Sequence, residues 1–204
     1  MSTYPRHPPR GAQLAVCVVL TATVGGCTTT IPGEPIAAKG SAVASQTAGS
    51  PPLPFAVTFT ERWNHRNDGS SFEPCTAYSS AELRSIGIDP ASVSDAAGHD
   101  SPNIRGCHWK RGDAGPSQFV TNPAGLDRYK RLQRDKRWSP DTIVNGRRIA
   151  VATGDDDTCG AAFESQRALV VTLITAYPQR TGRSLDEECA WVVRFASMAA
   201  ARAP

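Results

Sequence analysis

Local signatures of several well-known catalytic machineries are missing from this chain. It contains no Gly-x-Ser-x-Gly elbow, no Ser-x-x-Lys, no His-Glu-x-x-His, no Walker A loop and no Gly-x-Gly-x-x-Gly fingerprint. Each of these motifs places a nucleophile, a metal or a phosphate by fixed spacing, so the chemistries that depend on them are disfavoured. A glycosidase draws its carboxylates from distant parts of a chain and leaves no local motif. The sequence therefore favours a non-enzymatic protein, with a hydrolase as the alternative.

A strong excess of charge of either sign is also missing. The 204 residues include 22 Lys and Arg against 19 Asp and Glu, which gives a formal net charge of +3. Proteins that bind nucleic acids usually show a pronounced basic excess. The balance therefore argues against nucleic acid as a partner, and the composition is that of one globular domain with tails.

The most apolar stretch near the N-terminus is too short to cross a membrane comfortably. It covers Gly11–Val24 and follows two basic residues, Arg6 and Arg10, whereas a membrane-spanning helix needs about 20 residues. A basic start, a short apolar core and then small residues are typical of an export signal.

A cysteine, Cys27, directly follows this signal. The tetrapeptide Val24-Gly25-Gly26-Cys27 resembles the bacterial lipobox, where the signal is cut before a cysteine that carries diacylglycerol. We expect residues 1–26 to be a lipoprotein signal peptide and Cys27 to be the lipidated first residue of the mature chain. The alternatives are an ordinary signal peptide with a chance cysteine, or an uncleaved anchor helix.

Residues 27–54 then form the lipidated cysteine and a linker rich in Ser, Thr, Ala, Gly and Pro. Such a segment buries too little apolar surface to offset its ordering entropy, so we expect a flexible tether. Two acyl chains hold a protein firmly at a membrane. We therefore expect residues 55–204 to form a single domain on the extracytoplasmic face of the cell membrane, with the membrane as a partner through Cys27.

Four cysteines remain in the expected domain, and we expect them to form two disulfides: Cys75, Cys107, Cys159 and Cys189. An even count in an exported chain is typical of paired cysteines. Zinc is the alternative, but zinc ligands usually occur as close pairs such as Cys-x-x-Cys, and these cysteines lie far apart. We expect neither a metal nor another cofactor.

Helix signals flank the domain. Ser79 with Glu82, and Ser184 with Glu187, are capping boxes that predict a short helix ending near Gly87 and a long C-terminal helix reaching Ala201. Apolar residues recur at helical spacing along the second helix, and Cys189 lies on its buried stripe.

The segments between the helices predict strands. Ile149–Thr153 and Ala161–Phe163 are short β-type runs, and Ala168–Ala176 is rich in β-branched residues and suits a central strand. Together with the helices, these runs indicate an α+β fold, an antiparallel sheet packed by a few helices and stapled by two disulfides. Three pairings of the cysteines are open. We favour Cys107 with Cys159, joining two strands, and Cys75 with Cys189, joining the two helix starts.

A basic segment, Ala124–Trp138, is predicted to be an amphipathic helix because Leu126, Tyr129 and Leu132 fall on one side. Its cations form a candidate anion-facing surface, which would touch acidic lipid headgroups or phosphate-bearing polymers. A solvated outer face is the simpler interpretation and the one we favour. The six cations are Arg128, Lys130, Arg131, Arg134, Lys136 and Arg137.

Two further groups carry weaker signals. Asp155-Asp156-Asp157 lacks the alternating spacing of an EF-hand loop, so a polar turn between strands is favoured over a calcium site. Three histidines have no partner at motif spacing, and lone histidines are weak indications of catalysis. They are His65, His99 and His108.

Scattered short motifs resemble a known family. They are Phe72-Glu73-Pro74-Cys75, Ala81-Glu82-Leu83 with Gly87, Cys107-His108-Trp109, Asn145-Gly146, Cys159 and Glu188-Cys189. In this combination they are similar to actinobacterial secreted lipoproteins, typically mycobacterial cell-envelope proteins, built on an uncharacterised domain with four cysteines. The resemblance covers roughly Trp63 to Ala201. The usual Asp-Pro-Cys of that family is Glu73-Pro74-Cys75 here, which keeps the carboxylate.

The resemblance implies an α+β domain outside the membrane, and it supplies no catalytic residues. Together with the anchor, it leads us to expect an accessory or binding protein of the cell envelope whose ligand or protein partner is unknown. A concave apolar pocket in the structure would favour ligand binding.

The lipid anchor can be tested directly by intact-mass analysis of protein extracted from membranes. We expect a mature chain that begins at Cys27 and carries the mass of a diacylglycerol on that residue. A mature chain that begins elsewhere, or one without lipid at Cys27, would contradict this prediction.

Overall fold

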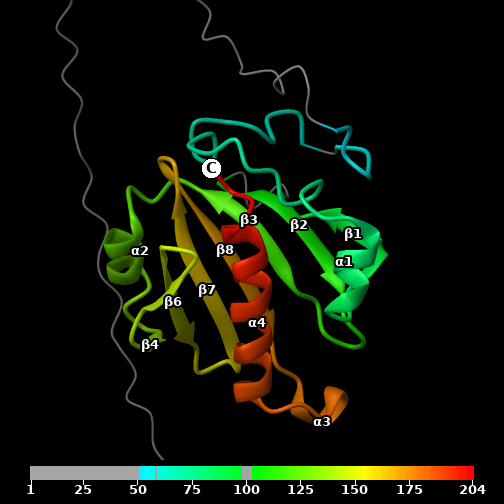
Figure 1. The fold of residues 1–204 in the computed structure, drawn as a ribbon, viewed down its shortest axis with the longest axis vertical. Coiled ribbons are helices and arrows are strands. Elements are labelled where there is room, and N and C mark those ends of the chain that lie inside the picture. The colour runs from blue at the N-terminus through cyan, green and yellow to red at the C-terminus, as the bar shows by residue number, and fades with distance from the viewer. Residues whose placement is uncertain (1–50, 58, 98–102) are drawn as a thin grey trace, which may run out of the picture. The chain divides into compact units, whose positions relative to one another are not determined.

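An antiparallel sheet of eight strands organises the residues that the computed structural model describes, 51–57, 59–97 and 103–204. The order across the sheet is β1-β2-β3-β8-β7-β6-β4 (Figure 1), and β5 also pairs with β6. The strands are β1 (Asp89–Asp95), β2 (Arg105–Lys110), β3 (Ser117–Thr121), β4 (Arg137–Trp138), β5 (Thr142–Val144), β6 (Arg147–Thr153), β7 (Thr158–Ser165) and β8 (Ala168–Thr175).

The strand predictions are confirmed where the sequence is rich in Ala and β-branched residues. The predicted central strand is β8, which lies between β3 and β7. A tight turn joins β5 and β6, where Asn145 and Gly146 both have positive φ, 51° and 75°. An Asn-Gly pair favours this kind of turn because both residues tolerate the left-handed region.

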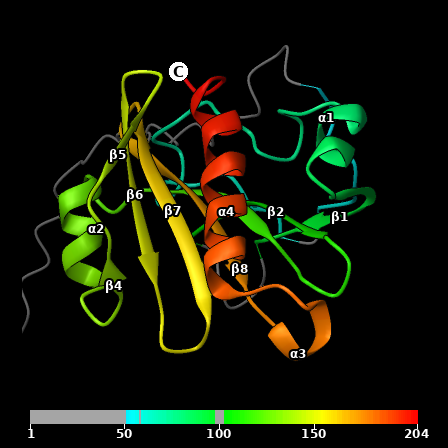
Figure 2. The ribbon, with the colours of Figure 1, turned by 60° about the horizontal axis from the view of Figure 1, so that its bottom comes forward.

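One long helix covers one face of the sheet. Helix α4 (Leu185–Ala200) begins at the predicted capping box of Ser184 with Glu187, and it packs against β6, β7 and β8 (Figure 2). The buried residues of α4 pack against the strand residues on the face of the sheet that α4 covers. The buried residues of this layer include Ile149, Phe163, Val170, Ile174, Val192, Phe195 and Ala199.

Helix α1 (Ser80–Ser85) also begins at its predicted capping box, formed by Ser79 and Glu82. It joins the α4 layer through Trp191, whose indole N–H donates to the carbonyl of Ile86 over 2.7 Å. A short helix, α3 (Pro178–Thr181), lies between β8 and α4. Among the described helices, none is both long and apolar enough to cross a membrane.

The predicted helix at Ala124–Trp138 is much shorter than expected. Helix α2 covers only Leu126–Leu132, and Arg137 and Trp138 pair with β6 as strand β4. The ring of Trp138 lies edge-on to that of Tyr129, with 6.1 Å between the ring centroids. Pairing with β6 and packing on Tyr129 partly bury the indole, and this outweighs the helix propensity of the charged residues around it.

The expected disulfide pairing is wrong, although all four cysteines are paired. The bonds are Cys75–Cys107 and Cys159–Cys189. Cys107 lies in β2 and Cys159 in β7, with β3 and β8 between them. Three strand spacings amount to about 14 Å, and a disulfide allows only about 7 Å between Cα atoms. Two cysteines in strands can be bridged only when those strands are neighbours.

Peptide mapping under non-reducing conditions checks this pairing. We expect one linked pair of peptides that contains Cys75 with Cys107 and another that contains Cys159 with Cys189. A peptide linking Cys107 to Cys159 would contradict the strand order.

Candidate functional site

The face of the sheet opposite α4 is only partly covered. A smaller cluster on this face is formed by Leu126 of α2 with Ala150, Ala162, Leu169 and Val171 of the sheet. Helix α2 has seven residues and stands beside β4 and β6 at one side of the sheet (Figure 2). Among the described residues, no helix therefore covers much of this face.

A pocket of about 550 Å³ lies on this face, within the range of about 300–1,000 Å³ that is typical of small-molecule sites. Its floor is a row of directly paired residues from neighbouring strands. From β3 to β4 the row reads Ser117, Leu173, Gly160, Ala152 and Trp138.

Small residues create the hollow. A side chain at Gly160 would bring its Cβ to 2.6 Å from the Cδ2 atom of Leu173, so this space depends on glycine. Ala152 and Ala162 lie next to Gly160 on the same face and also line the pocket. Most of the pocket surface is apolar.

Aromatic residues form one wall of the pocket. Tyr129 projects from α2 and Trp138 from β4, and the indole N–H of Trp138 donates to the carbonyl of Gln133 over 3.1 Å. Burial raises the pKa of Tyr129 to about 12. Its hydroxyl makes no hydrogen bond within the described part of the chain. The wall therefore presents a neutral hydroxyl with free hydrogen-bonding capacity.

Opposite charges lie together at the edge of the pocket. Lys136 Nζ is 3.4 Å from Asp156 Oδ1, and both side chains reach solvent. Gly154 packs directly beneath them, since a Cβ there would lie 2.2 Å from the Asp156 carboxylate. The hydroxyl of Thr158 and the ammonium of Lys136 lower the pKa of Asp156. This pair leaves no net charge on that side of the pocket.

A serine and a histidine meet at the other end of the floor. Ser117 Oγ and His108 Nδ1 are 2.6 Å apart, and Ser117 lines the pocket. Burial lowers the pKa of His108, partly offset by the charge of Asp95. A neutral imidazole can accept the proton of the serine hydroxyl. No third residue within the described ranges binds the other ring nitrogen of His108.

The predicted anion-facing surface divides into two sets of three. Lys130, Lys136 and Arg137 form ion pairs with Asp141, Asp156 and Asp155. The other three have no ion pair or hydrogen bond among the described residues. They are Arg128, Arg131 and Arg134. The cations therefore do not form one unpaired surface.

The remaining predicted features either form a turn at the edge of the pocket or lie outside the residues that the structure describes. Asp155–Asp157 form the predicted turn between β6 and β7. Among residues 51–57, 59–97 and 103–204, no group of three or more His, Cys, Asp or Glu could hold a metal. Cys27, the signal at 1–26 and His99 lie outside the described residues.

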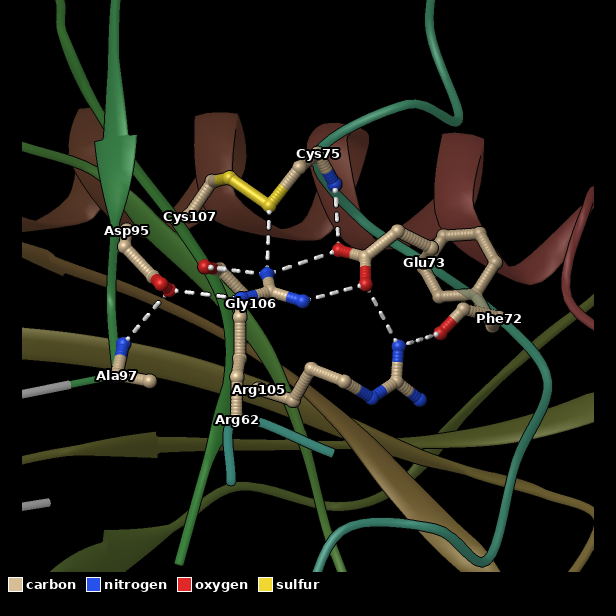
Figure 3. Close-up of a disulfide and its surroundings, with 9 residues drawn as sticks. All are labelled: Arg62, Phe72, Glu73, Cys75, Asp95, Ala97, Arg105, Gly106 and Cys107. Carbon is tan, nitrogen blue, oxygen red and sulfur yellow. Dashed lines mark hydrogen bonds and ion pairs between the residues drawn. A yellow bond between two sulfur atoms is a disulfide. The ribbon is translucent and has the colours of Figure 1, made fainter. Parts of the chain in front are cut away.

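The structure brings together a buried ion cluster that the sequence did not reveal (Figure 3). The Glu73 carboxylate accepts from Arg62 over 2.7 Å and from Arg105 over 2.9 Å. Arg62 also pairs with Asp95 at 2.9 Å and donates to Cys75 Sγ over 3.1 Å. Arg105 is fully buried and lies over the ring of Trp63 at 3.7 Å.

The two arginines of this cluster stabilise the charged form of Glu73. Burial alone would raise the pKa of Glu73, but the hydrogen bonds and charges of Arg62 and Arg105 outweigh it and hold the pKa below its ordinary value. Arg105 also donates to the carbonyls of Phe72 and Ser70 over 2.9 and 2.8 Å. The cluster thus fixes a segment without regular structure against β2, and we interpret it as structural rather than catalytic.

A second buried carboxylate lies near the other disulfide. Glu188 is fully buried in the first turns of α4 and pairs with Arg111 and Arg183, each at 2.5 Å. The guanidinium of Arg111 also lies over the ring of Trp191 at 4.5 Å. These contacts tie the β2–β3 connection to the start of α4.

Residues 22–202 match the family described as Protein of unknown function (DUF3558). The chain belongs to this family. Four cysteines in two disulfides agree with the four-cysteine domain that the sequence resembled. Comparison with curated proteins and with solved structures finds no significant match.

The pocket residues of this DUF3558 protein were missed at the level of sequence. The sequence pattern places Tyr129 and Trp138 in one amphipathic helix and gives Gly160 no role. A usable signal was present in β7, where Thr158, Gly160 and Ala162 occupy alternate positions. Small residues on one face of a buried strand leave space above it.

Replacing Glu73 tests the buried ion cluster. Neutralising one partner of a buried pair costs about 3–5 kcal/mol, because the other charge stays buried. We expect Glu73→Gln to lower the free energy of unfolding in urea by this amount at neutral pH. Asp127→Asn is the control, since Asp127 forms an exposed pair with Arg148 that should contribute about 1 kcal/mol or less.

The pH dependence of Glu73→Gln gives a second readout. The folded pKa of Glu73 lies below the ordinary value of 4.5, so its stabilisation is complete above that value and is lost as the pH falls through the folded pKa. The wild-type protein should therefore lose more stability than Glu73→Gln on acidification. Parallel losses in the two proteins would contradict the assignment.

Proposed function

We propose that this DUF3558 protein is a lipid-anchored, non-enzymatic binding protein of the cell envelope, which holds a small apolar molecule in the pocket between α2 and the open face of the sheet. The observation that carries the proposal is the pocket itself, with a volume of about 550 Å³ and a mostly apolar lining. A concave apolar pocket with a few polar groups is the usual form of a small-molecule site.

The location rests on the N-terminal sequence and on the cysteines. The lipobox-like Val24-Gly25-Gly26-Cys27 supports lipidation at Cys27 and retention at the extracytoplasmic face of the cell membrane. Two disulfides are consistent with an oxidising compartment. We propose that the linker between Cys27 and the domain acts as a tether, since a flexible coil of about 27 residues spans on the order of 30 Å. The domain can therefore reach ligands at the membrane surface or in the adjacent envelope.

The geometry of the pocket supports binding more than catalysis. Catalytic sites usually gather several titratable groups with perturbed pKa values in one cleft. Here the two carboxylates that each pair with two arginines, Glu73 and Glu188, belong to ion clusters that do not line the pocket. Within the pocket, Lys136 and Asp156 neutralise one another.

A hydrolase acting on envelope lipids or glycans is the alternative, and the Ser117–His108 pair favours it. In this alternative, Ser117 attacks an ester carbonyl and His108 takes its proton. The position of Ser117 argues against the hydrolase. Ser117 lies in β3, an interior strand of the sheet that pairs with β2 on one side and with β8 on the other. Its surrounding amides are engaged in the ladders and are poorly placed to stabilise an oxyanion.

Native mass spectrometry tests the proposed function. The Cys27→Ser chain is purified without detergent, so that neither its own lipid nor detergent occupies the pocket. We expect a bound molecule that is released on denaturation. Gly160→Leu and Ala152→Leu fill the floor from β7 and β6 and should abolish the bound mass, while unchanged disulfide maps and circular dichroism show that they fold.

A wild-type protein that carries no bound molecule would contradict the proposal. A bound molecule that is retained by both filled variants would place binding elsewhere and would also contradict it. Covalent labelling of Ser117 by a fluorophosphonate, lost in His108→Ala, would favour the hydrolase instead.

A further inference from the structure

The polar groups of the pocket define what kind of ligand it can hold. Lys136 and Asp156 are the oppositely charged pair at its edge, 3.4 Å apart. The other lining residue that titrates is Tyr129, whose hydroxyl is neutral at neutral pH, and burial raises its pKa further, to about 12. The lining therefore offers no unpaired charge to a ligand.

A charged ligand group in this pocket would lack a counter-charge. Moving an ionised group from water to an apolar site without a partner is strongly unfavourable. The charged group of the ligand could gain a counter-charge only by taking Lys136 or Asp156 out of their ion pair, and the other member of the pair would then lose its partner. Neutral molecules face no such penalty.

One lining group does have unused hydrogen-bonding capacity inside the pocket. The Tyr129 hydroxyl makes no hydrogen bond within the described residues. Its ring is held by Trp138 and by the backbone of α2, where the Tyr129 amide donates to the carbonyl of Gly125 over 3.0 Å. The hydroxyl is therefore fixed in position and can donate to, or accept from, a ligand.

We infer that the pocket takes an uncharged amphipathic molecule, whose alkyl or ring portion lies on the Gly160 floor and whose hydroxyl, carbonyl or ester group meets Tyr129. This inference rests on the proposed function and names the ligand class of the same site. The floor of Gly160, Ala152 and Leu173 suits the apolar portion because it presents no polar side chain.

Three probes of equal chain length separate the effect of charge from that of apolar burial. Decanol, decanoate and decylamine are titrated into the Cys27→Ser chain by calorimetry at neutral pH, below the solubility limit of decanol and below the micelle-forming concentrations of the two ions. We expect decanol to bind at least about tenfold more tightly than either ion, since each ion must bury an uncompensated charge. Tighter binding of decanoate or decylamine overturns the inference.

Tyr129→Phe tests the polar contact. Loss of one net hydrogen bond should weaken decanol binding about two- to tenfold. Tyr177→Phe is the matched control, because Tyr177 is exposed and lies outside the pocket. The Tyr177→Phe protein should bind decanol as tightly as the wild type does. Unchanged decanol affinity in Tyr129→Phe overturns the assigned role of the hydroxyl.

The failure of this inference can be told from the failure of the proposed function. A charged molecule released from the purified protein, with binding that Gly160→Leu abolishes, overturns the ligand class and leaves the binding function intact. Absence of any bound molecule, together with no binding of the three probes, overturns both.

Discussion

The structure depends on a mismatch between a sheet with two apolar faces and the one long helix that the described residues supply to cover them. An exposed apolar sheet face is unfavourable, and most folds cover such a face with a second layer. Helix α4 has 16 residues, which gives a length of about 24 Å and is enough to cross the central strands. Helix α2 has only seven. The pocket is the part of the second face that α2 leaves uncovered.

The two disulfides are placed beside the two buried ion clusters. Cys75–Cys107 lies against Arg62, and Cys189 directly follows Glu188. Loops of 32 and 30 residues give about 3–4 kcal/mol each in the chain-entropy model. Buried ion pairs contribute little net stability but are costly to break. The disulfides therefore stabilise the folded domain, and the ion clusters beside them hold the adjoining segments in their orientation.

Features that depend on neighbours in the chain were predictable. Both capping boxes and the central strand β8 follow from local residue patterns, and the structure contains all three. Strand order was not predictable in this way, and the wrong disulfide pairing followed from it. Cys107 and Cys159 are both in strands, but their separation depends on β3 and β8 lying between them.

The pocket and the ion cluster were beyond the reach of local patterns for the same reason. The pocket floor joins residues from β3, β8, β7, β6 and β4 through cross-strand register. Arg62 and Glu73 lie in a segment without regular structure, where periodicity gives no signal. The end of α2 does not follow from local pattern because the pairing of Trp138 with β6 and its packing on Tyr129 are tertiary effects.

The pairing of consecutive cysteines has a consequence for how this domain matures. A chain delivered from its N-terminus, by a ribosome or through an export pore, presents Cys75 and Cys107 before Cys159 and Cys189. Among these four cysteines, oxidation in order of emergence produces the native bonds directly. Maturation then requires an oxidant of thiols but no isomerase, because no bond between these cysteines has to be broken and formed again.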